Sequence, residues 1–375
     1  MQECKGIAVP RLEALAVKNY QIHQRLEMRG LTPYVVIVGE NGSGKSTLLD
    51  ILAFFAECMA YGVKVAVNRR GGFEALRSKG QSGPVEIAIK YRERPEAPAI
   101  IYHLTIDQGP AGPYVAEEWV QWKRGLKGNI CRFLEAKNGK CAVIGGISPH
   151  EQDVSVNEVL ESNQYLAVGI MGQFSQYPRI SALRKYILSW QVELSGQERV
   201  SGGIPATWPE NGEAARALAR LFPERFQHAV SFLNEHTLSG RQIGFGPLQE
   251  MILAGDKLPG GMNRVLERLL LLAQPEFHNL MAFENLEADL YPTLLKAFQQ
   301  EHRQASRSGQ VFSVTNSPLL LDACRSDEVW LLTSDAQGVS EACRVDEMPG
   351  IQRAVEQGAL LGQLWSEGYF IGKKG

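Results

Sequence analysis

The fold of this chain is decided by the octapeptide Gly39-Glu40-Asn41-Gly42-Ser43-Gly44-Lys45-Ser46, which matches the pattern G-x-x-x-x-G-K-[ST] in full. Glycines at these places let backbone N–H groups turn inward around a β-phosphate. Lys45 supplies a positive charge for the β- and γ-phosphate oxygens, and the Ser46 hydroxyl is the kind of group that binds Mg²⁺ beside them. The octapeptide therefore predicts a phosphate-binding loop (P-loop) for a nucleoside triphosphate.

The residues on either side of the octapeptide support this prediction. Tyr34–Val38 is a continuous apolar run of buried-strand length, and residues 44–58 have the pattern of a helix. A strand, a glycine-rich turn and a helix are the context in which the motif binds phosphate. We therefore expect ATP and Mg²⁺ as ligands, with Thr47 continuing the binding segment after Ser46. The loop alone does not choose among kinases, GTPases, AAA+ motors and ABC-type ATPases.

Mixed strand and helix patterns continue through the first 165 residues. Alternating segments typical of strands follow the helix at residues 85–91, 100–106, 114–122 and 130–143. Asn138-Gly139 within the last segment is the signal of a type I′ hairpin. These features predict an antiparallel β meander.

The middle of the chain is helical in pattern. Apolar residues recur with helical spacing at residues 214–221 and 226–233, and Pro223 separates the two segments. The stretch 195–209, rich in Gly, Pro and Ser, is predicted to be a loop that leads into them. After residue 275 short apolar runs return at residues 280–283, 311–314 and 329–332. Their alternation with helical patterns is typical of strands in a parallel sheet.

Composition and charge exclude several classes of protein. The chain has 375 residues, 44% hydrophobic and 21% charged, which argues for a globular core and against a disordered or fibrous chain. The net charge of −2 argues against a polybasic coat for membranes or nucleic acid. No apolar segment reaches the length of a membrane span, and the N-terminus has no secretory signal pattern. Because the six cysteines are scattered without a C-x-x-C pair, we expect reduced thiols in a cytoplasmic protein.

Basic residues gather in two places that a nucleic acid backbone could follow. They are Arg69, Arg70, Arg77 and Lys79, and then Lys90, Arg92, Arg94, Lys123, Arg124 and Lys127. Acidic residues are interleaved with them, which favours an ordinary solvated face. Nucleic acid binding stays open as an alternative.

Three later segments follow the P-loop in a recognisable order. Leu258-Pro259-Gly260-Gly261-Met262-Asn263-Arg264 directly precedes a predicted helix. Residues 280–292 read L-M-A-F-E-N-L-E-A-D-L-Y-P, and residues 311–318 read V-F-S-V-T-N-S-P. This order resembles the ABC-type ATPases, specifically the stand-alone RecF/SMC-like branch that includes the "AAA family ATPases" of bacterial defence and repair operons. The opening at residues 15–21 and the tail at residues 361–368 are also similar to that branch.

The resemblance implies roles for residues of the second half. Glu284 takes the place of the Walker B Asp that joins Ser46 in the magnesium shell, and Asn285 takes the place of the catalytic Glu. An amide cannot accept a proton at neutral pH, and loss of a general base costs about 10²–10⁴-fold in rate. Asn316 replaces the switch histidine as a donor to the γ-phosphate. In an alternative register Glu284 is the base and Phe283 stands at the Asp position, which would leave Mg²⁺ without its carboxylate.

Two further elements follow from the same resemblance. The signature segment Leu258, Pro259, Gly260 and Gly261 would act in trans on the nucleotide of a second subunit, with Pro259 in place of the signature serine. A Q-loop glutamine, which links Mg²⁺ to the helical lobe, would be either Gln173 or Gln176. Leu194-Ser195-Gly196-Gln197 also looks like a signature, but no amphipathic helix follows it, so we interpret it as a loop.

The predicted fold is one α/β head of the P-loop NTPase class, an ABC-type ATPase head with an antiparallel β meander and an inserted helical lobe. Residues 1–165 and 276–375 form the P-loop lobe, and residues 166–275 form the helical lobe with the signature. The resemblance implies an ATP-binding switch or scaffold that dimerises, or forms a higher oligomer, through its nucleotide. Such a protein would control a partner effector such as a nuclease in antiphage defence, with slow or absent hydrolysis. The alternative is an active, DNA-stimulated ATPase of DNA repair or chromosome maintenance.

Overall fold

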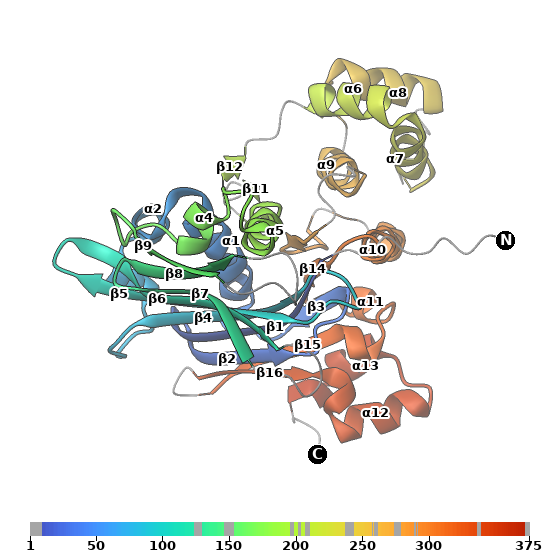
Figure 1. The fold of residues 1–375 in the computed structure, drawn as a ribbon. Coiled ribbons are helices and arrows are strands. Elements are labelled where there is room, and N and C mark those ends of the chain that lie inside the picture. Colours follow the sequence, from blue (N-terminus) through green and yellow to red (C-terminus); the bar gives the residue numbers. More distant parts are fainter. Residues whose placement is uncertain are drawn as a thin grey trace.

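Two eight-stranded sheets, with helices between and around them, organise the computed structural model (Figure 1). The structure describes residues 10–371 except 124–129, 146–153, 196–198, 202–203, 207–210, 237–243, 257, 259–261, 274–278, 289, 291 and 336–338. One sheet, the core sheet, contains the strand that precedes the P-loop, and the other is antiparallel throughout.

The core sheet places the P-loop strand among parallel neighbours. Its strands lie in the order β12-β11-β10-β13-β14-β3-β15-β16. In that order their bounds are Ile204–Ala206, Arg199–Ser201, Gln191–Glu193, Met281–Phe283, Val311–Val314, Tyr34–Val38, Val329–Ser334 and Ser340–Arg344. Strands β10, β13, β14, β3 and β15 pair in parallel, which confirms the predicted sheet. The carboxyl ends of these strands therefore meet at one edge, where folds of this kind bind ligands.

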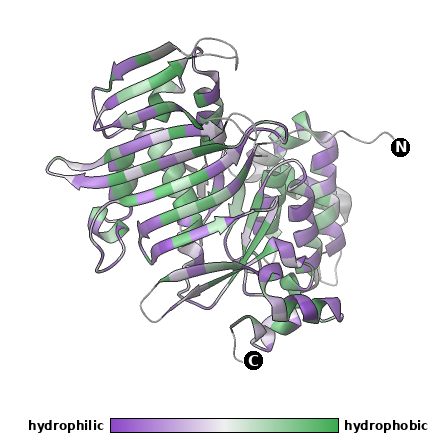
Figure 2. Ribbon diagram, turned by 60° about the horizontal axis from the view of Figure 1, so that its bottom comes forward, coloured by the Kyte–Doolittle hydropathy of each residue, from purple (hydrophilic) through white to green (hydrophobic). Residues whose placement is uncertain are grey.

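The second sheet is the predicted antiparallel meander. Its strands lie in the order β2-β1-β4-β5-β6-β7-β8-β9, with the bounds His23–Arg29, Arg11–Tyr20, Val85–Arg92, Ile100–Gly109, Gly112–Lys123, Ile130–Lys137, Lys140–Gly145 and Val154–Val159. Asn138 and Gly139 join β7 to β8 with φ angles of 48° and 82°, as a type I′ hairpin requires. Hydrophilic and hydrophobic residues alternate along these strands (Figure 2), so one face turns to the core and the other to solvent.

Helix α1 joins the two sheets through apolar contacts. It runs over Lys45–Tyr61, and its buried side chains, among them Leu48, Phe54 and Phe55, belong to one apolar cluster with residues of both sheets. The other helices are α2 (Val63–Arg69), α3 (Phe73–Leu76), α4 (Ala167–Met171), α5 (Pro178–Leu188), α6 (Asn211–Leu221), α7 (Pro223–His236), α8 (Phe245–Ala254), α9 (Met262–Leu272), α10 (Pro292–Ala305), α11 (Pro318–Leu321), α12 (Pro349–Glu356) and α13 (Leu361–Ser366). Within the described ranges, every helix is too short or too polar to span a bilayer.

The helical lobe begins later in the chain than expected. We predicted its start at residue 166, but α4 and α5 pack in the same apolar cluster as α1. In this cluster the ring of Tyr186 of α5 stacks on the ring of Tyr91 of β4, with 4.8 Å between the ring centroids. Strands β10 to β12 then extend the core sheet. Helices α6 to α9 belong instead to a second apolar cluster on the core sheet, and Figure 1 shows α6, α7 and α8 grouped at one end of the molecule. In the structure the helical lobe therefore consists of α6 to α9.

A buried glutamine fastens the antiparallel sheet to the core sheet. Gln310, next to β14, donates from Nε2 to the carbonyl oxygens of Leu12 and Thr32 at 2.9 and 3.0 Å. Its Oε1 accepts the Leu12 N–H at 2.9 Å. Because buried polar groups need partners, these bonds hold the start of β1 in one place.

A buried carboxylate fastens α4 to the antiparallel sheet. Glu118 of β6 accepts the N–H groups of Ala167 and Val168 at 2.5 and 2.9 Å and the Tyr102 hydroxyl at 2.8 Å. Burial raises the pKa of Glu118 to about 7, and the hydrogen bonds oppose that rise. These contacts give Glu118 a structural role in holding α4 against β6.

The titration of Glu118 should make the fold less stable as pH rises. The unfolded carboxyl ionises near its ordinary pKa of 4.5, whereas the folded one keeps its proton up to about pH 7. Between these values the folded state binds more protons, so the free energy of unfolding falls with rising pH. Glu118→Gln does not titrate and should lack this component. We expect the difference in unfolding free energy, wild type minus Glu118→Gln, to shrink between about pH 5 and about pH 8 in urea titrations.

The neighbouring Glu117→Gln provides the control. It makes the same carboxyl-to-amide change one residue away, where the side chain faces the other side of the strand and is half-buried. A difference between wild type and Glu118→Gln that stays constant with pH would contradict the assignment.

Candidate nucleotide-binding site

The P-loop joins β3 to α1 at the carboxyl edge of the core sheet. A Cβ atom on Gly39 would lie 2.2 Å from the Leu332 carbonyl oxygen, and one on Gly44 would lie 2.4 Å from His23 Cε1. Gly44 also has a φ of 95°, in the left-handed region that favours glycine. The close packing of neighbouring strands around the loop therefore requires glycine at both positions.

The start of α1 suits a bound anion. Its first turn contains no acidic residue, so the positive end of the helix dipole is not neutralised there. Lys45 Nζ donates to the carbonyl oxygens of Gly39 and Glu40 at 2.6 and 2.8 Å. Burial lowers the pKa of Lys45, and the nearby carboxylates of Glu284 and Glu287 partly offset this effect. A phosphate oxygen would be a stronger acceptor for this ammonium group than the two carbonyls.

Glu284 follows β13 directly and reaches the P-loop. Its Oε1 accepts a hydrogen bond from the Ser46 hydroxyl, and its Oε2 accepts the Ser195 N–H at 2.6 Å. Hydroxyl and carboxylate oxygens are the hard ligands that Mg²⁺ prefers, so Ser46 and Glu284 fit this ion. Phe283 instead belongs to the second apolar cluster. This arrangement favours Glu284 as the magnesium-shell residue over the alternative register.

Asn285 presents an amide beside this carboxylate. It has a φ of 49°, a conformation that asparagine tolerates better than most residues. Its Nδ2 donates to Ser195 Oγ at 2.7 Å, and its side chain is exposed. An amide can orient a neighbouring group by hydrogen bonding, but it does not accept a proton at neutral pH. Asn285 therefore does not offer a general base beside Glu284.

Ser195 lies at the site, although we set aside the signature-like pattern around it. Strand β10 runs parallel to β13, and Ser195 follows its carboxyl end, where it bonds both Glu284 and Asn285. Leu194 and Ser195 lie outside regular secondary structure, and Ser195 belongs to the site. Gly196 and Gln197 lie outside the described residues. Strand β10 has only 3 residues. The alternation of Trp190, Val192 and Leu194 with polar residues is the signal that could have revealed it.

Gln173 and Gln176 do not lie with these residues. Gln173 Nε2 donates to the Gly169 carbonyl oxygen at 3.1 Å, and Gly169 packs against Met59 near the last turn of α1. At 1.5 Å per residue, Met59 is roughly 20 Å along the helix from Lys45. Gln176 belongs to the same connection between α4 and α5. The residue that borders Glu284 from the neighbouring strand is Ser195, which follows β10.

Asn316 follows β14 and contacts the P-loop. With its amide nitrogen turned toward β3, it donates to the carbonyl oxygens of Gly39 and Thr315 at 2.9 and 3.1 Å. Its main-chain N–H donates to Glu287 Oε1 at 2.9 Å, and Thr315 Oγ1 donates to Glu287 Oε2 at 2.7 Å. The structure therefore brings Asn316 to the site and adds Glu287, to which the motifs assigned no role.

The predicted signature segment precedes a helix, as expected. Helix α9 begins at Met262, and the Leu258 N–H donates to Asn263 Oδ1 at 3.1 Å. Pro259, Gly260 and Gly261 lie outside the described residues.

A buried arginine of α9 ties the helical lobe to the site. Arg268 is 1% exposed. Its Nη2 donates to Glu193 Oε1 at 2.6 Å and to the Glu284 carbonyl oxygen at 3.3 Å, and its Nη1 donates to the Leu286 carbonyl oxygen at 3.2 Å. Glu193 ends β10, and Glu284 follows the end of β13. The helix that follows the signature is therefore fastened to two strands that border the site.

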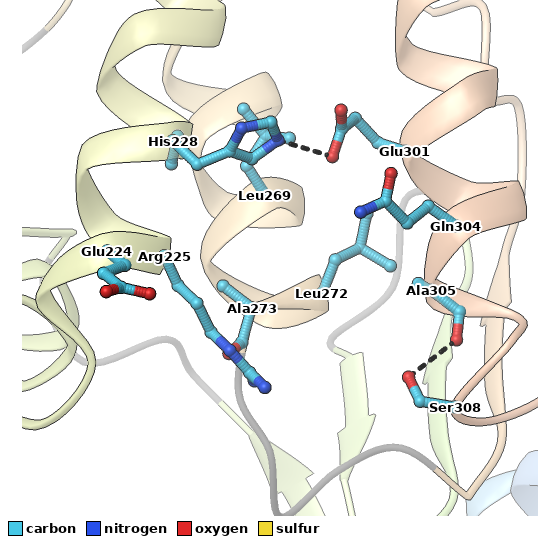
Figure 3. Close-up of a pocket in the computed structure, with 11 residues that line it drawn as sticks. Glu224, Arg225, His228, Leu269, Leu272, Ala273, Glu301, Gln304, Ala305 and Ser308 are labelled. Carbon is cyan, nitrogen blue, oxygen red and sulfur yellow. Dashed lines mark hydrogen bonds and ion pairs between the residues drawn. The ribbon is translucent and has the colours of Figure 1, made fainter. Parts of the chain in front are cut away.

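An open cavity of about 300 Å³ lies where the helical lobe meets α10 (Figure 3). His228 of α7 and Glu301 of α10 contact each other across it, with 2.9 Å between Nε2 and Oε2. Leu272 and Ala273 line it from the end of α9, opposite the end where the signature lies. The cavity is therefore separate from the nucleotide site, and a shift of α7 against α10 would change its width.

Several basic residues of the two clusters have acidic partners. The ion pairs are Arg70 with Asp50 and Glu57, Arg77 with Glu74, and Lys90 and Arg92 with Glu13. Arg70 is also largely buried, with 9% of its side chain exposed, so it cannot follow a phosphate backbone. Arg124 and Lys127 lie outside the described residues. Among the described residues, this pairing favours the solvated-face interpretation.

Arg268→Met should destabilise the protein by about 3 kcal/mol, because it leaves the Glu193 carboxylate without its closest partner and two carbonyl oxygens without donors. Glu193→Gln keeps an acceptor oxygen and should cost less. A double-mutant cycle measured by chemical denaturation should show a coupling above about 1 kcal/mol.

Arg264→Met is the matched control for this cycle. Arg264 lies on the same helix and faces the same carboxylate, but at 3.8 Å and with 33% of its side chain exposed. Its replacement should cost less than that of Arg268. Additive effects of Arg268→Met and Glu193→Gln would contradict the tie between α9 and β10.

Comparison with known proteins finds one family that matches part of the sequence. Residues 11–173 match the family described as "AAA ATPase domain". No curated protein matches the sequence.

Solved structures that are similar to the chain include heads of SMC proteins. The SmcHead bound to the C-winged helix domain of ScpA aligns with a TM-score of 0.53 and 14% identity, over 90% of this chain and 99% of that chain. The SMC head domain from Thermotoga maritima aligns with a TM-score of 0.42 and 14% identity, over 89% and 99%. The Smc head domain with an extended coiled coil bound to the C-terminal domain of ScpA, from Pyrococcus furiosus, aligns with a TM-score of 0.45 and 13% identity, over 92% and 100%.

At 14% identity the first of these structures shows the fold alone. The family match includes the P-loop, whereas the segments that follow β13 and β14 lie beyond residue 173. Residues 11–173 therefore match the AAA ATPase domain family, and the chain has the fold of an SMC head.

Proposed function

We propose that this protein is an ATP-dependent clamp, a switch or scaffold whose copies assemble around ATP and hydrolyse it slowly or not at all. One observation carries the proposal. Glu284 engages Ser46 of the P-loop, whereas Asn285 beside it offers only an amide. The groups that bind a nucleotide are thus brought together, and the group that would activate water is missing at its usual place.

Each binding residue has a task in this proposal. Lys45 would exchange its bonds to loop carbonyls for bonds to the β- and γ-phosphates, next to the positive end of α1. Ser46 and Glu284 would hold Mg²⁺, which neutralises phosphate charge when bound. The amide of Asn316, which lies against Gly39, would donate to a γ-phosphate oxygen.

A second copy completes the proposed clamp. The resemblance to RecF/SMC-like ATPases assigns the signature at Leu258–Gly261 to the nucleotide of another subunit. A twofold arrangement would then bury two ATP molecules between two heads. The tie between Arg268 and Glu193 supports this arrangement, because it makes the position of the signature helix depend on the site of its own subunit.

A protein partner is the third part of the proposal. The similar SMC head was solved with a domain of ScpA bound to it, so this fold can carry a protein partner. The motif order resembles ATPases of bacterial defence operons. We therefore propose that the closed clamp controls an effector, such as a nuclease, in antiphage defence in the cytoplasm.

The alternative is an active, DNA-stimulated ATPase of DNA repair or chromosome maintenance. One observation favours it. The carboxylate of Glu287 contacts the switch segment. Burial lowers the pKa of Lys45, and Glu287 lies close enough to offset part of that effect. A carboxylate in that place could replace the base that Asn285 lacks.

Assembly and turnover in the same samples should separate the two functions. With Mg-ATP the wild-type mass measured by light scattering should rise about twofold or more, with phosphate release near background. Lys45→Ala should stay at its nucleotide-free mass, because the lysine that bonds the phosphates is lost. Lys64→Ala, at an exposed position on α2, is the control and should assemble like wild type. Brisk phosphate release by wild type that is lost in Lys45→Ala would exclude the clamp.

Restoring a carboxylate at the base position should create hydrolysis. Asn285→Glu should raise turnover by about 100-fold, the lower end of what a general base contributes. Asn285→Gln, which places a longer amide on the same backbone, should not. If Glu287 is the base instead, wild type turns over ATP and Glu287→Gln lowers that rate, while Asn285→Glu adds little.

A further inference from the structure

The C-terminal helix α13 is packed tightly on the segment that follows Asn316. A Cβ atom on Gly362 would lie 1.9 Å from the Pro318 carbonyl oxygen, so only glycine allows this approach. The Gly362 N–H donates to Asp322 Oδ1 at 2.7 Å. Figure 1 shows α13 beside α11, the helix that begins at Pro318. Helix α13 therefore has a fixed place relative to the switch segment.

Trp365 of α13 reaches the switch residue itself. Its indole Nε1–H donates to the Asn316 carbonyl oxygen at 3.3 Å. The indole ring packs edge-on against Phe370, with 5.6 Å between centroids, and Phe370 is buried. The indole is thus held by a neighbouring aromatic ring while its polar edge faces the main chain of Asn316.

Asn316 is held on its other sides by the nucleotide site. Its main-chain N–H donates to Glu287, and its amide donates to the Gly39 carbonyl oxygen, which Lys45 Nζ also contacts. The Trp365 bond is therefore the contact through which the C-terminal helix takes part in orienting this residue.

We propose that Trp365 is a positioning residue of the nucleotide site. Its indole N–H holds the main-chain carbonyl of Asn316 in place before the nucleotide binds. The position of this main chain in turn sets the direction of the Asn316 side-chain amide. This inference rests on the proposed function, because it requires ATP at the P-loop. An amide held next to Gly39 can donate to a terminal phosphate that ATP has and ADP lacks. Trp365 should therefore influence the preference for ATP over ADP rather than nucleotide binding as a whole.

The test is the ratio of ADP to ATP dissociation constants, measured by calorimetry with Mg²⁺ on the full chain, with a slowly hydrolysed ATP analogue in parallel. Trp365→Phe keeps an aromatic ring against Phe370 and removes the N–H. We expect it to lower the ratio about three- to tenfold, the range for one hydrogen bond, with ADP affinity within about twofold of wild type. Gln363→Ala, on the exposed face of the same helix and bonded only to Glu367 among the contacts seen here, should leave the ratio unchanged.

A second variant tests the same contact without touching Trp365. Gly362→Ala forces α13 away from Pro318 and should lower the ratio in the same direction. An unchanged ratio in Trp365→Phe, with wild type binding ATP, would overturn this inference and leave the clamp intact. Equal losses of ATP and ADP affinity would also overturn it, because they indicate a structural role only. Failure of wild type to bind ATP would overturn the proposed function and this inference together.

Discussion

The site depends on one carboxylate that is almost removed from water. Glu284 is 7% exposed, and a charge in such a place needs partners from every side. The P-loop supplies the Ser46 hydroxyl, and the loop after β10 supplies the Ser195 N–H. The main chain of the same residue bonds β10 through its N–H and α9 through its carbonyl oxygen. Three segments far apart in sequence therefore meet at Glu284.

The helical lobe and the C-terminal helix reach this site by separate contacts. Arg268 connects α9 to β10 and to the residues after β13, whereas Trp365 connects α13 to the residue after β14. Both contacts end on main chain or carboxylate groups at the carboxyl edge of the core sheet. That edge is where parallel strands leave space for a ligand, so elements that touch it can respond to whether the ligand is present.

Patterns within short stretches predicted much of this structure. The P-loop, the β meander with its hairpin at Asn138-Gly139 and the parallel runs that flank the loop all follow from local rules of periodicity and turn chemistry. We placed the start of the helical lobe at residue 166, whereas α4 and α5 pack in the first apolar cluster and α6 to α9 in the second. A local pattern does not tell which core a helix joins. The sequence likewise did not indicate that Ser195 borders Glu284, since residue type carries no information on which strand lies beside which.

The sequence by itself determined the phosphate-binding chemistry, because the glycines, Lys45 and Ser46 act through backbone conformation and bonding within one turn. The sequence also established that the Asn285 side chain cannot act as a general base, since this is a property of the amide alone. Only the tertiary structure decided that Ser195, Glu287, Arg268 and Trp365 surround the same site. These residues lie on different strands and helices, and their meeting depends on which strand enters the sheet beside which, an outcome of burying apolar surface over the whole chain.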